Sequence, residues 1–284
     1  MKLSIITINF NNYSGIKKTI ESVVGQKCSN LEYIVIDGDS TDGSVELLKK
    51  HDKMIDFWVS ERDRGIYHAM NKGIQRATGD YLLFLNSGDW LVDGILDGAE
   101  SWEWNKDLLC FNSYHYFSEK YTSQQKPPEI LAPRHLFCKN INHQSVFFKR
   151  ELFDKYGMYD ESYKICGDVD FFLRVVTDGA CSVHVDNFLV YYDRHGVSST
   201  NPQLVQEERE RAVQRYFNSA FFRDYEYYKR REEDLEILLW YREQEKLYKL
   251  LLVGYSFLNS VYRFIEKIKK KISVPSASTR RSVS

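Results

Sequence analysis

An apolar segment runs into a polar cluster with one carboxylate at residues 84–90, FLNSGDW. Asp89 could give a hard oxygen ligand to Mg²⁺ or Mn²⁺, which take only one or two protein carboxylates when substrate phosphates and water complete the shell. Asn, Ser, Gly and Asp are also the common turn residues. Taken alone, the segment fits a metal-binding loop and an ordinary turn about equally well.

Two more acids stand at the start of an apolar helical pattern, GDVDFFLRVVT, at residues 167–177. Asp168 and Asp170 could each interact favourably with the dipole at the amino end of a helix. An aspartate held at such a place could also act as a general base that takes a proton from an attacking hydroxyl. The residue types leave both interpretations open.

A third acidic cluster, DGDSTDGS, begins at Asp37. We expect its last acid, Asp42, to cap the helix that follows. Asp37 itself comes at the end of an apolar run, where a carboxylate can accept hydrogen bonds from a ribose hydroxyl or a base N–H. Ligand contact and a simple turn are both open for Asp37.

The elements around these clusters indicate an α/β fold. Residues 1–85 alternate short apolar runs with longer helix-period segments, which predicts βαβ units and a parallel sheet. In open sheets of this kind ligands bind beyond the carboxyl ends of the strands. The segments expected at that edge are NFNN, DGDSTDGS and NSGDW. From residue 91 to about residue 200 the pattern is mixed and continuous with the first half.

Composition restricts the class of protein further. The 284 residues include 43% hydrophobic and 28% charged residues, enough for a large globular core. Thirty-nine basic and forty acidic residues give a net charge of −1, which argues against a nucleic-acid partner. The apolar run at the amino terminus is too short for a signal peptide. The cysteines form no C-x-x-C pair and fit a reduced cytoplasm rather than disulfides or a zinc site: Cys28, Cys110, Cys138, Cys166 and Cys181.

The chain after Pro202 has a different character, being helical, highly charged and rich in tyrosine. Residues 247–272 are apolar but interrupted by charged side chains, so we do not expect them to cross a membrane. They could pack on the rest of the chain or on a second copy of it, or lie as an amphipathic helix on an anionic membrane. Residues 273–284 read as a disordered tail.

Several segments in a fixed order resemble the inverting family 2 glycosyltransferases of the GT-A fold, in the style of bacterial surface-polysaccharide enzymes. They are SIITINFNN, VIDGDSTDGS, RGIYHAMNKGIQRATGDYLLFLNSGD, NHQSVFFKRELFDKYGMYDES and GDVDFFLRV. The resemblance covers roughly residues 1–200. It implies a Rossmann-like, mostly parallel central sheet flanked by helices, with a catalytic domain at 1–202 and a helical C-terminal extension at 203–272.

The resemblance also assigns roles to residues. Asp168 would be the base that activates the acceptor, and Asp89 and His195 would hold Mn²⁺ or Mg²⁺. Thr7 and Asn9 are expected just after the first strand, where the nucleotide is received. The full predicted nucleotide-sugar site is Thr7, Asn9, Asp37, Asp39, Arg64, Gly65, Asn71, Asn86, Ser87 and Gly88.

The sequence departs from the family pattern at three points. Gly38 replaces the second carboxylate of the usual D-D-G-S sequence, so either Asp37 or Asp39 could meet the nucleoside. Asn86 replaces the first acid of the metal motif, which leaves Asp89 as the only acidic ligand in that loop. Gly167 replaces the glutamate of the usual Glu-Asp pair, which leaves Asp168 as the base with Asp170 as an alternative.

The function implied is transfer of a sugar, with inversion, from a UDP-linked nucleotide sugar to a lipid-linked sugar acceptor in bacterial O-antigen, capsule or exopolysaccharide biosynthesis. Residues 196–202, GVSSTNP, are expected to form a loop that closes over the site. Two alternatives remain. A sugar nucleotidyltransferase needs a glycine-rich basic loop after the first strand, where this chain has NFNNY. An inactive nucleotide-sugar-binding or scaffolding subunit fits the depleted metal motif but not the retention of Asp89 and Asp168.

Overall fold

A computed structural model of the chain describes residues 1–26, 30–138, 141–218 and 256–265, together with a few single positions between 220 and 234. The chain divides into two compact units, Met1–Arg223 and Asp224–Ser284. In the second unit residues 256–265 are helical, with exposed Phe257, Leu258, Tyr262 and Phe264. Within these described ranges, no helix has the length and apolar character needed to cross a membrane.

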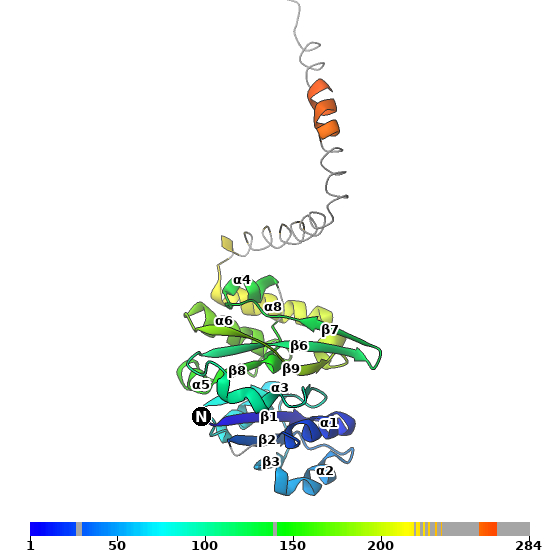
Figure 1. The fold of residues 1–284 in the computed structure, drawn as a ribbon, viewed down its shortest axis with the longest axis vertical. Coiled ribbons are helices and arrows are strands. Elements are labelled where there is room, and N and C mark those ends of the chain that lie inside the picture. Colours follow the sequence, from blue (N-terminus) through cyan, green and yellow to red (C-terminus); the bar gives the residue numbers. More distant parts are fainter. Residues whose placement is uncertain are drawn as a thin grey trace, which may run out of the picture. The chain divides into compact units, whose positions relative to one another are not determined.

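The amino-terminal half of the first unit is the predicted parallel sheet, in the order β3-β2-β1-β4. Figure 1 labels β1, β2 and β3 of this half. Its strands are β1 (Leu3–Asn9), β2 (Leu31–Asp37), β3 (Phe57–Ser60) and β4 (Tyr81–Phe84). They are connected through α1 (Tyr13–Val24), α2 (Ser44–Lys50), the 3-10 turn η1 (Asp52–Met54) and α3 (Ile66–Arg76). The register pairs Asn9 with Asp37 and Asp37 with Ser60, so the carboxyl ends of three strands lie level with one another.

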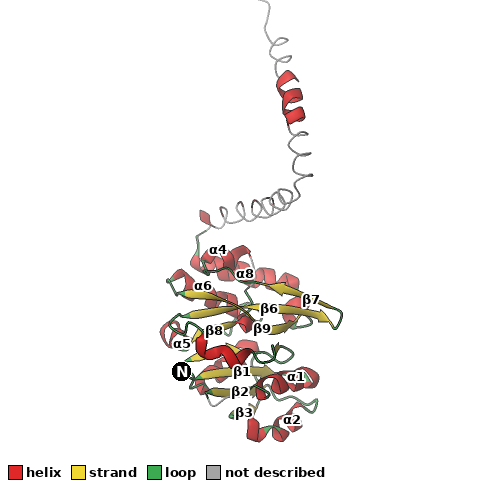
Figure 2. Ribbon diagram, viewed as in Figure 1, coloured by secondary structure: helices red, strands yellow, loops and turns green. Residues whose placement is uncertain are grey.

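The second half extends the same sheet with mixed strand directions. β8 (Val146–Lys149) runs antiparallel to β4 and β6 (Leu108–Ser118), whereas β9 (Ser182–Asp193) runs parallel to β6. β5 (Trp90–Leu91) pairs antiparallel with β9, and β7 (Tyr121–Gln125) pairs antiparallel with β6. The sheet is therefore parallel throughout its first half and mixed in its second. Figure 2 shows its strands in yellow and the surrounding helices in red.

The remaining helical elements of this unit lie between residues 95 and 216. They are η2 (Ile95–Ser101), α4 (Pro133–Cys138), η3 (His143–Ser145), α5 (Glu151–Tyr156), α6 (Gly167–Thr177), α7 (Val197–Thr200) and α8 (Pro202–Tyr216). Among them, α8 packs against α6 and belongs to the first unit. The predicted boundaries at 202 and 272 remain predictions, and the predicted tail at 273–284 lies outside the described residues.

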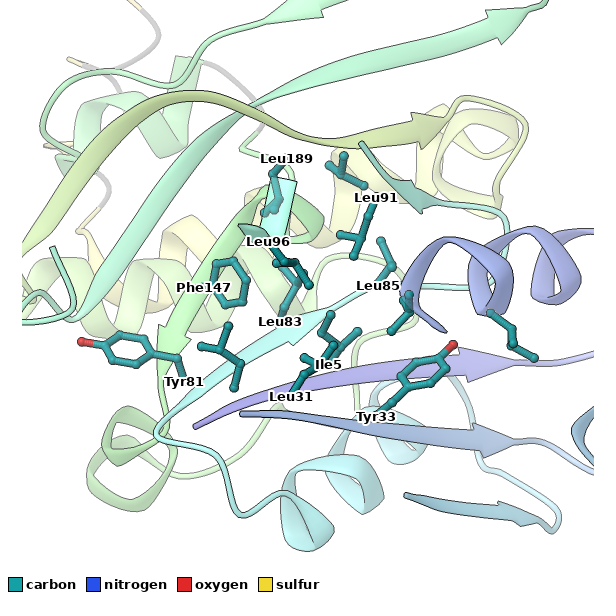
Figure 3. Close-up of a cluster of buried hydrophobic side chains, with 14 of the residues drawn as sticks. Ile5, Leu31, Tyr33, Tyr81, Leu83, Leu85, Leu91, Leu96, Phe147 and Leu189 are labelled. Carbon is teal, nitrogen blue, oxygen red and sulfur yellow. The ribbon is translucent and has the colours of Figure 1, made fainter. Parts of the chain in front are cut away.

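Buried side chains from both halves of the sheet form one core cluster (Figure 3). Ile5 of β1, Leu83 of β4, Phe147 of β8 and Leu189 of β9 are each fully buried. Full burial of such a side chain contributes roughly 1.5–3 kcal/mol relative to exposure. The shared core joins the parallel and mixed halves, so the strands of the first half keep a fixed position relative to β8 and β9 in the second.

A second cluster of aromatic rings packs α6 against α5 and the end of β4. Phe171 of α6 stacks on Phe153 of α5 with ring centroids 4.4 Å apart and an interplanar angle of 7°. Tyr159 packs on both of these rings and on Phe84 at the end of β4. Since rings of this size bury large areas and have defined orientations, the first turn of α6 rests on a rigid base.

Candidate active site

Asp37 stands at the end of β2 and links three neighbouring strands. Its side chain is fully buried, and Oδ1 accepts hydrogen bonds from Asn9 Nδ2 at 2.7 Å and Ser40 Oγ at 2.6 Å. Oδ2 accepts from the Ser40 N–H at 2.9 Å and from Ser60 Oγ at 2.6 Å. A carboxylate has about four acceptor positions, so Asp37 is already saturated by protein donors. These hydrogen bonds show that Asp37 fixes this edge of the sheet. Its contact with a nucleoside remains a prediction.

Thr7 and Asn9 lie within β1, so the expectation that they follow the first strand was wrong. Thr7 is fully buried and accepts a hydrogen bond from the Tyr33 hydroxyl at 3.2 Å. Asn9 is 4% exposed and has no partner for its Oδ1 atom. Both side chains are used inside the sheet, since Asn9 donates to Asp37 and the backbone pairing with β2 continues to Asn9.

Asp39 and Phe10 are among the exposed residues at this edge. Asp39 is exposed and has a left-handed backbone with φ of 68°. Phe10 is 66% exposed, although aromatic side chains usually find cover, and its ring lies beside Gly38. Between the two acids that the sequence left open, only Asp39 therefore has a free approach from solvent. Phe10 was missed, because one aromatic residue in a polar loop gives no distinct sequence signal.

The predicted segment 64–71 forms the loop before α3 and the start of that helix. Gly65 has φ of 134°, a backbone conformation that favours glycine. Arg64 pairs with Glu161 at 2.7 Å near the surface. Asn71 is buried and uses both ends of its amide on the backbone of Tyr159, at 3.0 Å each. Asn71 consequently tethers the 157–161 segment, and its predicted contact with nucleotide remains a prediction.

The loop of residues 86–89 is a turn clamped onto α1. The Asp89 N–H donates to the Asn86 carbonyl at 3.0 Å, as in a four-residue turn. Thr19 of α1 is fully buried, donates to the Asp89 carbonyl at 2.7 Å and accepts the Gly88 N–H at 3.0 Å. Asn12 Nδ2 donates to the carbonyl of Ser87. The turn and the metal-loop interpretations are therefore compatible.

Asp89 points into the protein from this loop. It is 4% exposed, and its Oδ1 accepts the N–H of Asp193 at 2.8 Å. Burial raises the pKa of Asp89 to about 7, although the Asp193 hydrogen bond, the charge of His143 and a hydrogen bond from Gln144 oppose the shift. A proton and a cation would thus compete for this carboxylate near neutral pH.

The donor set of this loop fits a hard divalent cation that also binds phosphate oxygens. Asn86 Oδ1 is buried and has no hydrogen-bond partner, which leaves an oxygen available beside Asp89. In the part of the chain that the structure describes, no three His, Cys, Asp or Glu side chains are placed to hold a metal ion by themselves. The cation would therefore need oxygens from the substrate, as Mg²⁺ commonly does.

His195 lies two residues beyond Asp193, on the exposed side of the same region. Its Nδ1 is 2.5 Å from Asp193 Oδ1, while the Asp193 backbone contacts Asp89. His195 is thus connected to Asp89 through Asp193, and its predicted role at the metal remains a prediction. The expected closing loop at 196–202 was wrong in form, because residues 197–200 make α7 and α8 starts at Pro202.

Asp168 occupies the first turn of α6 and is fixed at both oxygens. Tyr67 of α3 lies 3.0 Å from Oδ1, and His143 Nδ1 lies 2.9 Å from Oδ2. Burial alone would raise the pKa of Asp168, but the hydrogen bonds from His143 and Tyr67 and the charge of His143 hold it below its ordinary value. The side chain is still 14% exposed, so a substrate hydroxyl can reach an ionised carboxylate.

Glycine at position 167 makes this arrangement possible. A Cβ atom there would lie 2.8–2.9 Å from the ring of Tyr67. Such contacts are shorter than real Cβ atoms show, so any larger residue would displace the tyrosine that contacts Asp168. The departure from the usual Glu-Asp pair therefore has a structural counterpart in Tyr67.

Asp170 serves a different purpose from Asp168. It is fully buried, with Arg174 2.6 Å from Oδ2 and Arg215 of α8 3.2 Å from Oδ1. Tyr163 and Tyr216 add hydrogen bonds to Oδ1. Because no part of its side chain is exposed, Asp170 is not accessible as an alternative base.

His143 is a further site residue that the sequence reasoning missed. It lies in η3, is 8% exposed, and places Nε2 3.3 Å from Asn86 Nδ2 while Nδ1 faces Asp168. The imidazole therefore bridges the 86–89 loop and the first turn of α6. The only sequence signal was its position in NHQSVFF, directly before a buried strand.

The sheet and its flanking helices have the architecture of the GT-A fold. The chain belongs to glycosyl transferase family 2, whose model matches residues 4–165. The GT-A resemblance stated from the sequence is thereby confirmed.

Individual relatives agree with this class. An uncharacterized glycosyltransferase of Mycobacterium tuberculosis is 32% identical over 212 residues, which are 69% of this chain and 77% of the relative. A PGL/p-HBAD biosynthesis glycosyltransferase of Mycobacterium bovis is 28% identical over 205 residues, 69% of this chain and 79% of the relative.

Solved structures share the fold. TarS of S. aureus in complex with UDP-GlcNAc matches with a TM-score of 0.57 and 17% identity, over 68% of this chain and 58% of the TarS chain. This chain thus spans less than two thirds of the TarS chain that it matches. At this identity the likeness concerns the fold alone.

Proposed function

We propose that the protein transfers a sugar from a UDP-linked nucleotide sugar to a sugar acceptor, with inversion at the anomeric carbon. The observation that carries the proposal is the bridge from Asp168 through His143 to Asn86. It places an ionised, reachable carboxylate close to a loop suited to a diphosphate and its cation. One imidazole ring thus separates the proposed proton acceptor from the proposed leaving-group site, which supports a single displacement at a sugar held between them.

In this mechanism the acceptor hydroxyl gives its proton to Asp168 while its oxygen attacks the anomeric carbon. The bond from that carbon to the diphosphate oxygen breaks on the opposite face, which inverts the configuration. His143 and Tyr67 hold the carboxylate in place throughout. A divalent cation bound by Asp89 and Asn86 would neutralise the charge that the leaving diphosphate gains.

The nucleoside is assigned to the loops after β1 and β2. The exposed ring of Phe10 gives a face on which a base can stack, and the exposed carboxylate of Asp39 can accept a hydrogen bond from a base N–H. Uracil has such an N–H, and the TarS complex with UDP-GlcNAc supports a uridine donor on the same fold. Arg64 and Gly65 lie in the loop that would close over the ribose.

The acceptor is assigned as a lipid-linked sugar in bacterial polysaccharide or glycolipid biosynthesis, which the relative named for PGL/p-HBAD biosynthesis supports. The protein would work in the cytoplasm, peripherally on the inner face of the plasma membrane. The exposed apolar side chains at 257–265 supply a membrane-facing surface, and four lysines follow them in the sequence at 267–271.

Turnover tests the assignment. The full-length protein is incubated with UDP-, GDP- and dTDP-sugars and lipid-linked acceptors, with and without Mn²⁺. Release of nucleoside diphosphate and transfer of the sugar to the acceptor are measured. Asp168→Asn should abolish transfer, whereas Asp154→Asn, an exposed acid on α5, should not. Intact transfer by Asp168→Asn, or no binding of any nucleotide sugar, would exclude the mechanism.

Membrane contact has its own test. Full-length protein should sediment with vesicles that contain anionic lipid, and a chain ending after residue 244 should remain in the supernatant. Full-length protein that stays in the supernatant and elutes as a homodimer would assign the C-terminal helices to a second copy of the chain instead.

A further inference from the structure

Glu208 lies on α8, far along the chain from the residues described above, and is 7% exposed. Its Oε1 accepts the backbone N–H of Lys164 at 2.8 Å. Its Oε2 accepts the N–H groups of Ile165 and Cys166 at 2.8 and 3.0 Å. Three backbone donors converge on one buried carboxylate, which fixes the segment that leads into α6.

The same segment contacts the proton acceptor through Tyr67. The Tyr67 hydroxyl lies 2.5 Å from the carbonyl oxygen of Ile165 and 3.0 Å from Asp168 Oδ1. Because Ile165 and Cys166 share a peptide unit, Glu208 holds that unit at its N–H and Tyr67 contacts it at its C=O. A continuous line of short contacts therefore joins α8 to Asp168.

Tyr67 has one hydroxyl proton for two acceptors, the Ile165 carbonyl and the Asp168 carboxylate. The position of the Ile165 carbonyl therefore decides how the proton is shared and where the hydroxyl oxygen rests. Glu208 controls that position because it accepts the N–H of the same peptide.

We propose that Glu208 is a positioning residue for Asp168, acting through the Ile165–Cys166 peptide and Tyr67 to hold the carboxylate in its reactive placement. The proposal rests on the proposed function in that it takes Asp168 as the proton acceptor. α8 would accordingly be part of the working site rather than an appendage to it.

The attachment of α8 does not depend on Glu208. Arg215 pairs with Asp160 at 3.0 Å and with Asp170 at 3.2 Å, and Ala212 and Val213 are buried. A variant that loses only the Glu208 charge should therefore keep the helix docked. Glu208→Gln makes this change, because an amide can accept fewer of the three N–H groups.

The matched control is Glu207→Gln, the neighbouring acid, which is exposed and contacts Gln203 on the same helix. Both full-length variants would be checked for an unchanged thermal transition. Tyr67→Phe removes the hydroxyl that links Ile165 to Asp168 and leaves α8 unchanged. It is the second variant, to be used if Glu208→Gln does not fold.

The first measurement needs no substrate. Protein with ¹³C-labelled aspartate carboxyl groups is titrated, and the Asp168 signal is assigned by its loss in Asp168→Asn. Glu208→Gln and Tyr67→Phe should each raise the midpoint of Asp168 by roughly 0.5–1 pH unit, because a hydrogen bond to the ionised form is weakened. Glu207→Gln should leave it unchanged. An unchanged midpoint in folded Glu208→Gln would overturn the proposal.

The second measurement separates positioning from general stability. With a donor that turns over, Glu208→Gln should lower kcat by about 10- to 100-fold, the effect of a small misplacement of a reacting group, and leave the donor KM unchanged. In a Tyr67→Phe background, where the line of contacts is already cut, it should cause no further loss. An unchanged kcat, or an equal loss in that background, would contradict the proposal. Intact transfer by Asp168→Asn would instead overturn the proposed function, while the titration still decides whether Glu208 acts on Asp168.

Discussion

His143 Nδ1 lies 2.9 Å from Asp168 Oδ2, and the opposite ring nitrogen of this histidine faces Asn86. An N–H at Nδ1 can donate to the carboxylate. One side chain then fixes the orientation of Asp168 and the distance to the 86–89 loop.

His143→Ala should reduce transfer by about 100-fold through kcat, because Asp168 would lose one of the contacts that orient it. The donor KM should change less than kcat, since His143 contacts the 86–89 loop through Asn86 but leaves the nucleoside loops untouched. Steady-state kinetics with varied donor checks this. His184→Ala removes a histidine of β9 that contacts Asn112, and it serves as the control. Equal kcat values for the two variants would show that His143 does not orient the base.

Substitution of Asp168 should affect activity, whereas substitution of Asp170 should affect stability. Asp170→Asn leaves Arg174 and Arg215 without their buried partner, so the free energy of unfolding should fall by about 3–5 kcal/mol. Asp168→Asn should lose transfer and retain most of its stability. Urea unfolding of both variants gives the comparison. A larger loss of stability for Asp168→Asn than for Asp170→Asn would reverse the two assignments.

Metal binding should depend on nucleotide. Asp89 is the only acid in its loop, and its raised pKa of about 7 means that protons compete with a cation near neutral pH. Titration calorimetry with Mn²⁺ should detect no stoichiometric binding to the protein alone and clear binding in the presence of UDP. Asp89→Asn should abolish Mn²⁺ binding in the presence of UDP. Asp93 is an exposed acid nearby, and Asp93→Asn should preserve that binding. Stoichiometric Mn²⁺ binding without nucleotide would contradict the prediction.

Glu32 should govern part of the acid stability of the sheet. Burial would raise its pKa, but hydrogen bonds from Ser4, Thr78 and Lys2 lower it to about 2 from an ordinary 4.5. A depressed folded pKa means that the stabilisation is fully present above pH 4.5 and is lost as pH falls towards 2. Glu32→Gln should therefore cost about 1–2 kcal/mol at pH 7, allowing for solvent screening, and almost nothing near pH 2.

Urea unfolding at several pH values between 2 and 7 measures this difference. Glu46→Gln, an exposed acid of α2, provides the reference. A penalty for Glu32→Gln that is the same at pH 3 and pH 7 would show that its charge is not the cause.

The sequence was sufficient to predict the parallel half of the sheet and the edge where polar segments gather. Apolar runs such as YLLFL and YIVI, separated by helix-period segments, indicate buried strands wherever they occur. The order of the motifs also identified the family. These features are local, or repeat along the chain, and can be read without knowing which residues meet in space.

The side-chain network could not be predicted in this way. Asp37 and Asp39 look equivalent in the sequence, and only packing shows that one is saturated and the other exposed. The contacts of Asp168 with His143 and Tyr67 span 25 and 101 residues. Such pairings depend on the register of β8 and on the docking of α3, which no periodicity in the sequence encodes.

The match to the family model ends at residue 165, inside the segment whose N–H groups Glu208 accepts. A gene fragment trimmed to that match would keep the loops after β1 and β2 and the 86–89 turn but lack α6, β9 and α8. Such a fragment would retain the loops proposed to bind the donor but would lack Asp168, the proposed proton acceptor. In a chimera between two relatives, the junction should therefore lie after α8. Asp168 and the helix proposed to position it then come from the same protein.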